Sequence, residues 1–253
     1  MITYMYDGTF EGFLTMIHRS YMYKEVAYRI IKTPLETNLL DTTISVITNR
    51  TYAQKVLKSL EERFEKRYFN RIFHIFMCDT HDFEKALYDY IILGFRDQKN
   101  LADITHPSIH YIEKLEQEYF RYLHKMYGFV RFEELEEGTL YGRLEGKFNI
   151  LPLLGKHFAR RLNGCDFVLH DLQRSLAYLH NGEGDTIREV ATYEIPKRSL
   201  HEEKFQKLWK TFFTHVTIGT RQNLKLQQNW VPLLYRKYMT EFANKTTTTP
   251  VKV

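Results

Sequence analysis

The chain has 253 residues, of which 43% are hydrophobic and 15% aromatic, so a wholly disordered chain is excluded and a substantial core is expected. Its two cysteines, Cys78 and Cys165, are too few for a disulfide framework, a paired CxxC zinc site or a three-cysteine iron–sulfur motif. The formal net charge of +5 permits an acidic partner. Because neither a signal-peptide pattern nor an apolar run of membrane-spanning length is visible, we expect a cytoplasmic protein that enters no membrane.

The N-terminal part is expected to contain one strand and then mainly helices. Residues 2–6 alternate as a strand does, and Asp7-Gly8 favours a turn after them. Thr9 can then cap a helix, because apolar side chains recur at helical spacing through residues 10–21. Helical spacing predicts three further helices, at residues 51–76, 82–95 and 108–126. Residues 33–49 fit either a loop or a helix.

After Gly128 the pattern changes to short alternating segments, which predict an antiparallel sheet. The predicted strands are residues 129–133, 139–145, 166–170, 174–180 and 186–193. Asn181-Gly182 supplies the turn chemistry of a hairpin. A helix at residues 150–162 interrupts the strands, and two helices, at residues 201–213 and 223–242, follow them.

These elements predict an α+β fold in two parts. Residues 1–127 hold the N-terminal strand and the mainly helical region, residues 128–242 hold the antiparallel sheet with its helices, and residues 243–253 form a disordered tail. The first strand could instead join the later sheet, which would make the two parts a single unit.

A candidate phosphate-binding edge lies on the helix predicted at residues 150–162. His157, Arg160 and Arg161 project at or beside the edge of its apolar face. Two neighbouring guanidinium groups can bind phosphates bidentately. The alternative is that both arginines are solvated or paired with carboxylates.

A second candidate lies where one predicted strand ends and the next begins. There His170-Asp171 and Arg174 could bring together a base, a carboxylate and a cation. Asp171 could equally be a turn residue that accepts hydrogen bonds from its own backbone.

Several possible metal ligands lie near the end of the helix predicted at residues 51–76. They are His74, Cys78 and His81, with Asp79 and Asp82 nearby. One helical turn separates the first two, as a metal site could use. Cys78 follows an apolar run and is more simply a small core residue, so we predict no metal site.

Basic residues gather toward the C-terminus. Residues 197–238 contain nine Lys or Arg against two Glu, a balance of +7 in a chain whose total is +5. These cations are interleaved with Trp209, Phe212, Phe213, Trp230 and Tyr235. Cations and aromatic faces together are typical of a nucleic-acid groove. The alternative, which we favour for the two tryptophans, is the core of a helix pair whose solvated side is basic.

Three common motifs are missing from the sequence: the phosphate-binding GxxxxGK[ST] loop, GxGxxG after a strand, and HExxH. The sequence therefore does not favour a nucleotide-driven motor, a dinucleotide oxidoreductase or an ordinary zinc protease.

Five stretches of the chain resemble the successive signatures of a bacterial family assigned to DNA repair or DNA metabolism. They are Tyr6-Asp-Gly-Thr-Phe-Glu-Gly-Phe-Leu14, Val130-Arg-Phe132, Leu151-Pro-Leu-Leu-Gly-Lys-His-Phe-Ala-Arg-Arg161, His170-Asp-Leu-Gln-Arg174 and Ile218-Gly-Thr-Arg-Gln-Asn-Leu-Lys-Leu-Gln227. The resemblance runs from Tyr6 to about Phe242. It is interrupted at Glu145-Gly-Lys-Phe148, where the family has a turn that contains proline.

The resemblance implies a DNA-directed role. Members of that family are encoded beside a radical-SAM protein of DNA modification, and in some relatives a similar region is fused to a uracil-DNA glycosylase-like domain. With two cysteines, this chain cannot itself be the radical-SAM component, so the resemblance implies an accessory partner of such an enzyme.

Three hypotheses follow. In the first, the chain is a DNA-binding accessory protein whose phosphate contacts are Arg160, Arg161, Arg174, Arg221 and Lys225. In the second, it is a DNA-processing enzyme whose acid–base centre is formed by His157, His170 and Asp171. In the third, it is a protein-interaction module that never contacts DNA. The sequence leaves any cofactor unassigned.

Overall fold

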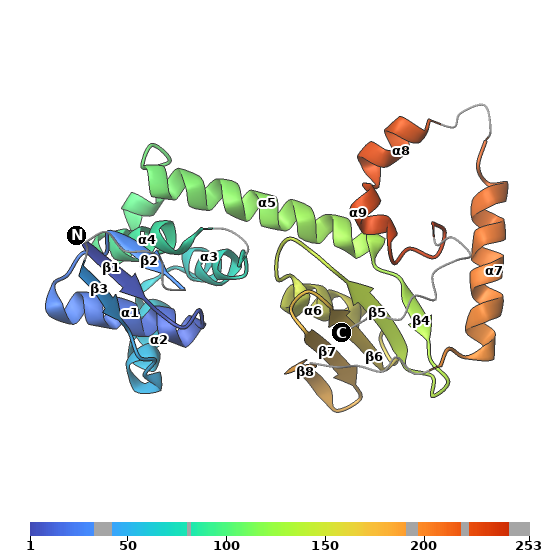
Figure 1. Ribbon diagram of the computed structural model, residues 1–253, viewed down its shortest axis with the longest axis horizontal. Coiled ribbons are helices and arrows are strands. Elements are labelled where there is room, and N and C mark those ends of the chain that lie inside the picture. Colours follow the sequence, from blue (N-terminus) through green and yellow to red (C-terminus); the bar gives the residue numbers. More distant parts are fainter. Residues whose placement is uncertain (33–41, 80–81, 191–196, 219–222, 243–253) are drawn as a thin grey trace. The chain divides into compact units, whose positions relative to one another are not determined.

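The protein has an α+β fold, seen in a computed structural model that describes residues 1–32, 42–79, 82–190, 197–218 and 223–242 (Figure 1). It forms two compact units, unit 1 (Met1–Arg121) and unit 2 (Tyr122–Val253). The tail predicted to be disordered, residues 243–253, lies outside the described residues.

Unit 1 contains a small parallel sheet with the strand order β2-β1-β3. The strands are β1 (Ile2–Met5), β2 (Arg29–Ile31) and β3 (Thr42–Ser45), and β1 pairs in parallel with both others. The predicted first strand is therefore confirmed, but it does not join the later sheet, because its neighbours on both sides are strands of unit 1. The other two strands were missed because three or four residues carry too little periodicity.

Helix α1 (Phe10–Tyr23) begins where the sequence predicts. Thr9 is its N-cap, and the Thr9 hydroxyl oxygen accepts a hydrogen bond from the backbone N–H of Gly12 at 2.9 Å. Gly12 is required for close approach, because a Cβ atom there would lie 2.1 Å from the Asp7 carboxylate. The turn after β1 and the start of α1 are thus fixed together.

The remaining helices of unit 1 agree with the sequence except at one break and at a short 3-10 helix that was not predicted. They are α2 (Arg50–Arg63), α3 (Lys66–Phe76), α4 (Glu84–Arg96), the short 3-10 helix η1 (Gln98–Ala102) and α5 (Pro107–Phe129), which continues into unit 2. The single helix predicted at residues 51–76 is two helices. Phe64 interrupts it in extended conformation, and its ring packs edge-on against Phe95 at 5.2 Å between ring centroids. Packing on α4 therefore outweighs the local helical preference.

Unit 2 contains a five-stranded sheet with the strand order β4-β5-β6-β7-β8. The strands are β4 (Phe132–Glu134), β5 (Leu140–Leu144), β6 (Phe167–Asp171), β7 (Leu176–Asn181) and β8 (Gly184–Glu189). Three neighbouring pairs are antiparallel as predicted, but β5 and β6 are parallel. The reason is helix α6 (Leu151–Arg161), which carries the chain back before β6 begins and so forms a β-α-β crossover.

Helix α6 buries the apolar side that its sequence predicts. Leu151, Leu154 and Phe158 are at most 4% exposed, and the Phe158 ring meets that of Phe132 in β4 at 4.9 Å between centroids. Gly155 lets the helix backbone lie directly on the ring of Tyr178 in β7.

The C-terminal helices are α7 (Leu200–His215), α8 (Leu224–Trp230) and α9 (Leu233–Arg236). The last helix predicted, residues 223–242, is therefore too long. Pro232 separates α8 from α9, since proline has no N–H to donate and its ring clashes with the preceding helical turn.

The contact between α6 and β7 gives a first prediction. Gly155→Ala would place a methyl group 2.3 Å from a ring carbon of Tyr178, so we expect a loss of about 1–3 kcal/mol of unfolding free energy in urea denaturation. Gly128→Ala is the matched control, because no atom lies within 4 Å of its added Cβ and alanine favours α5 by up to about 1 kcal/mol. Equal stability of the two variants would contradict this packing.

Candidate functional site

Asp171 lies in a turn at the end of β6, where its carboxylate is hydrogen-bonded within the protein. Its carboxylate is fully buried and accepts hydrogen bonds from the backbone N–H groups of Gln173 (3.1 Å) and Arg174 (3.3 Å). It also accepts one from the Arg174 guanidinium at 2.9 Å. Burial raises the pKa of Asp171, while Arg174 and these hydrogen bonds oppose that rise. Asp171 is therefore a turn residue that accepts hydrogen bonds from the backbone that follows it, which was one of the two interpretations of the sequence.

Arg174 links this turn to the segment that precedes α6. Its side chain is 9% exposed and also donates to the carbonyl oxygens of Gly146 (3.0 Å) and Lys147 (3.4 Å). The guanidinium is thus committed to a carboxylate and two carbonyls of its own unit, which removes it from the set of groups that can meet a phosphate.

His170 lies on the other face of the sheet from Asp171, because consecutive residues of a strand point to opposite faces. It is 5% exposed, and its Nδ1 lies 2.9 Å from the hydroxyl oxygen of Tyr141 in β5. Burial lowers the pKa of His170, and the nearby Asp171 charge offsets this in part. A neutral imidazole at neutral pH follows.

His157 is held on α6 against another element. Its ring stacks on Tyr127 of α5 at 4.0 Å between centroids and 18° between planes. Its Nε2 is buried without a hydrogen-bond partner among the described residues. Burial, Arg161 and Arg160 lower the pKa of His157, in that order. The three residues proposed as one acid–base centre thus contact three different partners: Tyr127, Tyr141 and Arg174.

A groove in unit 2 brings two residues that the sequence singled out together with several that it did not. Its volume is about 460 Å³, and it lies between the end of α5, the end of α6 and α7. It is lined by Tyr127, Gly128, Val130, Arg131, Phe132, Phe158, Arg161, Leu162, Glu202, Phe205, Gln206, Trp209 and Thr240. Arg161 and Trp209 are the members that the sequence analysis named, and the exposed Arg160 is the neighbour of Arg161 on α6.

The carboxylates beside this groove are occupied by protein donors. Arg131 binds Glu241 through two hydrogen bonds, at 2.6 and 3.3 Å, and the indole N–H of Trp209 donates to the same carboxylate at 3.2 Å. Glu202 is 9% exposed and accepts from the backbone N–H of Glu134 and the side-chain amide of Gln206. The negative charges of Glu241 and Glu202 are therefore largely compensated by donors of unit 2.

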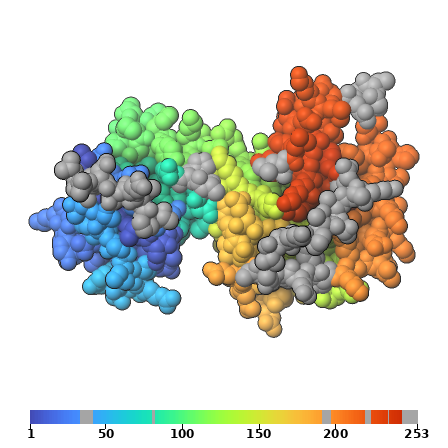
Figure 2. Space-filling model, in the orientation of Figure 1, coloured from blue at the N-terminus to red at the C-terminus, as the bar shows by residue number. Residues whose placement is uncertain are grey.

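Both tryptophans are exposed, so the core interpretation favoured for them is wrong, whereas Phe213 of α7 is half-buried against Phe242. Trp209 is 41%, Phe212 57% and Trp230 73% exposed, and Phe205 of the same helix is 64% exposed. On α7 these positions follow helical spacing, which marks an apolar face but does not show whether another element covers it. Figure 2 shows α7 in orange and α8 in red on the surface of the protein.

Some of the basic groups of the C-terminal segment are exposed but paired with carboxylates. Arg198 binds Glu133 through two hydrogen bonds, at 2.9 and 3.0 Å, and Lys237 pairs with Glu145 at 2.7 Å. Exposed cations stay on α6, α7 and α8, at Arg160, Arg161, Lys204, Lys207 and Lys225. The candidate Arg221 lies outside the described residues.

The possible metal ligands near the end of α3 have other partners. His74 Nδ1 lies 2.9 Å from a carboxylate oxygen of Glu116, and the Cys78 thiol donates to the carbonyl oxygen of His74 at 3.3 Å. His81 lies outside the described residues. Where the chain is described, no three His, Cys, Asp or Glu side chains are grouped as metal ligands would be, and no helix is both long and apolar enough to span a bilayer.

Comparison with known families places the chain in one of them. Residues 81–241 match the model of a family described as a domain of unknown function, DUF4130. Because this match covers more than half of the chain, the protein belongs to the DUF4130 family. The match includes all of the groove described above. No curated protein matches the chain.

The buried pair at the end of β6 gives a second prediction. Asp171→Asn would leave the Arg174 charge buried without its counter-charge, so we expect a loss of roughly 3 kcal/mol or more of unfolding free energy. Asp185→Asn, at a more exposed pair with His180, should cost less than about 1 kcal/mol. Similar losses of unfolding free energy in both variants, measured by urea denaturation, would show that the buried Asp171–Arg174 pair stabilises the fold no more than the exposed pair does.

Two histidines of unit 2 whose pKa is lowered, His157 and His170, give a third prediction. Because the folded forms of His157 and His170 bind protons less readily than the unfolded chain, stability is lost as pH falls through the unfolded pKa of about 6.5. We expect the thermal midpoint to fall between about pH 7.5 and about pH 5.5, and to fall less in His157→Gln. His201→Gln, at an exposed histidine of α7, controls for the loss of any histidine. A fall in His157→Gln as large as in the unmodified protein would contradict the prediction.

Proposed function

We propose that this protein binds single-stranded DNA through unit 2, as an accessory protein in DNA repair or base modification. The observation that carries the proposal is the exposure of Phe205, Trp209 and Phe212 on the same helix as two exposed lysines, beside the groove that contains Arg161. Exposed rings interleaved with cations are what proteins use to stack unpaired bases while neutralising phosphates.

The geometry of α7 suits a series of stacked bases. Phe205 and Trp209 are four residues apart, which separates them by about 6 Å along the helix axis, and both line the groove. The hydrogen bond from the Trp209 indole to Glu241 fixes the edge of the ring while leaving 41% of the residue exposed. A ring held in place loses little conformational entropy when a base stacks on it.

The charges beside the groove favour an anion. Glu241 is neutralised by Arg131, and Glu202 is buried and hydrogen-bonded, so neither presents a free negative charge to a phosphate. Arg160 and Arg161 at the end of α6 are exposed. Their effect on the pKa of His157 indicates a positive local potential there.

The proposed phosphate contacts differ from the set expected from sequence. Arg160, Arg161 and Lys225 are kept, and Lys204 and Lys207 are added because they are exposed on α7 beside the aromatic side chains. Arg174 is left out because its guanidinium is buried in the ion pair with Asp171.

An accessory role fits these contacts better than catalysis does. Of the three residues proposed for acid–base chemistry, His157 alone contacts a residue that lines the groove, Tyr127. Asp171 and His170 point to opposite faces of the sheet, each engaged with another side chain. The resemblance to a family of DNA repair or DNA metabolism supports a role beside a separate enzyme, and a radical-SAM protein is the partner that we propose.

The test is a fluorescence anisotropy titration with labelled single-stranded DNA longer than about 16 nucleotides, repeated at several salt concentrations. Trp209→Leu should weaken binding by roughly 5- to 150-fold, the value of about 1–3 kcal/mol per stacked base, and leave the salt dependence unchanged. Lys207→Gln should reduce the slope of log affinity against log salt by about 0.7, because one fewer counterion-releasing phosphate contact is made.

Two matched controls lie in the other unit. Phe120→Leu replaces a ring that is 40% exposed, and Lys114→Gln replaces an exposed lysine, both on α5, and neither should change the affinity. No affinity for single-stranded DNA at low salt would refute the proposal. Duplex binding as tight as single-strand binding, unaffected by Trp209→Leu, would refute stacking. Nuclease-resistant co-purification with an enzyme, without DNA affinity, would favour the protein-interaction hypothesis instead.

A further inference from the structure

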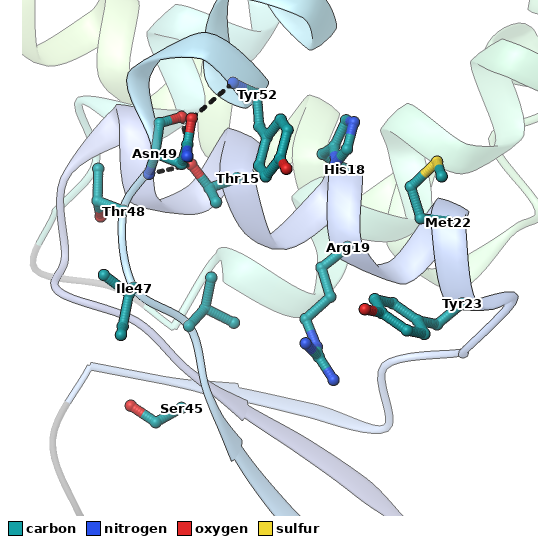
Figure 3. Close-up of a pocket in the computed structure, with 11 residues that line it drawn as sticks. Thr15, His18, Arg19, Met22, Tyr23, Ser45, Ile47, Thr48, Asn49 and Tyr52 are labelled. Atoms are coloured by element: carbon teal, nitrogen blue, oxygen red, sulfur yellow. Dashed lines mark hydrogen bonds between the residues drawn. The ribbon is translucent and has the colours of Figure 1, made fainter.

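A second cavity lies in unit 1, and none of its lining residues lines the groove of unit 2. Its volume is about 570 Å³, within the range of small-molecule sites. It is lined by Thr15, His18, Arg19, Met22, Tyr23, Ser45, Val46, Ile47, Thr48, Asn49 and Tyr52. All of these precede residue 81, where the DUF4130 match begins. Figure 3 shows α1 on one side of the cavity and the segment from Ser45 to Asn49 on the other.

The wall formed by the β3–α2 connection is fixed in place. The Asp7 carboxylate, just after β1, accepts a hydrogen bond from the Thr48 hydroxyl at 2.5 Å. The backbone N–H of Asn49 donates to the Thr15 hydroxyl oxygen at 3.1 Å, and the Asn49 side chain accepts from the backbone N–H of Tyr52 at 3.1 Å (Figure 3). A ligand would therefore meet a largely preformed site at the carboxyl end of a parallel strand, where open α/β sheets bind ligands.

Two flat aromatic surfaces line this cavity. The rings of His18 and Tyr52 are parallel, 4.3 Å apart with 4° between their planes. On the same side of the cavity as His18, the Arg19 guanidinium lies 4.6 Å from the centroid of the Tyr23 ring. Tyr52 is 42% and Tyr23 64% exposed, so faces of both rings are accessible to a planar ligand.

The charge of the lining is positive. Among the described residues that form it, none is acidic and Arg19 carries a full charge. The Arg19 Nε is buried without a hydrogen-bond partner in the described part of the chain. Arg19 Nε forms a long ion pair, at 3.9 Å, with the Glu25 carboxylate, which also accepts a hydrogen bond from the Tyr4 hydroxyl. Lys55 adds a second cation, 5.7 Å from the Tyr52 ring.

We propose that this cavity binds a mononucleotide, with the base stacked on an exposed face of Tyr52 or Tyr23 and the phosphate paired with Arg19. A ligand that joins a planar ring to an anion is what stacked aromatic side chains and an arginine without a matched acceptor recognise together. The exposed hydroxyl of Ser45 supplies a further polar contact along the wall. The inference does not depend on DNA binding by unit 2.

The experiment is isothermal titration calorimetry of the full chain with the four ribonucleoside 5′-monophosphates, and with adenosine and inorganic phosphate as part-ligands. We expect one monophosphate or more to bind at a single site, more tightly than either part-ligand. Arg19→Gln should weaken binding about tenfold or more, because a hydrogen bond to a charged group is lost. Tyr52→Leu should weaken it by roughly fivefold or more.

Arg67→Gln is the matched control, since Arg67 also lies over a tyrosine ring, at 4.3 Å from Tyr68, but does not line the cavity. It should bind as the unmodified chain does. So should Trp209→Leu, which separates this site from the proposed DNA surface. Circular dichroism would establish that each variant is folded. Absence of binding by every monophosphate, unchanged binding in folded Arg19→Gln, or equally tight binding of inorganic phosphate would each overturn the proposal.

Discussion

The buried ion pair between Asp171 and Arg174 is the contact on which the rest of unit 2 depends. It closes the turn between β6 and β7, and through the carbonyls of Gly146 and Lys147 it fixes the segment that leads into α6. Removing two charges from water is costly, and the cost is offset only when every remaining hydrogen-bonding atom finds a partner. The pair therefore holds α6, and with it Arg161 and the wall of the groove, in one position.

The fate of the other charges explains why net charge alone is a poor guide to a binding surface. The C-terminal segment is strongly basic, yet Arg198 and Lys237 are paired with carboxylates of the sheet region. Further exposed cations lie on α6, α7 and α8, beside a groove at which Glu202 and Glu241 are already hydrogen-bonded. A binding surface is made as much by neutralising nearby acids as by collecting bases.

Helix α7 has an apolar face of which several large side chains are exposed to solvent. Phe205 and Phe212 are each more than half exposed, although their spacing is that of residues that pack against a core. Large exposed rings in one region mark a surface that another molecule is expected to cover. The cavity of unit 1 is organised differently, since its exposed rings line a wall that internal hydrogen bonds already hold in place.

The sequence by itself determined the local elements: the Thr9 cap, the apolar side of α6 and most of the strands of unit 2 follow from spacing and capping chemistry within a few residues. Of the candidate site, it identified Arg161, but not its place beside Trp209 in a groove. Only the tertiary structure decided the parallel pairing of β5 with β6, the burial of Arg174 and the exposure of α7. The physical reason is that periodicity shows which face of an element is apolar, whereas partners distant in the sequence decide whether that face is covered and whether a charge is neutralised.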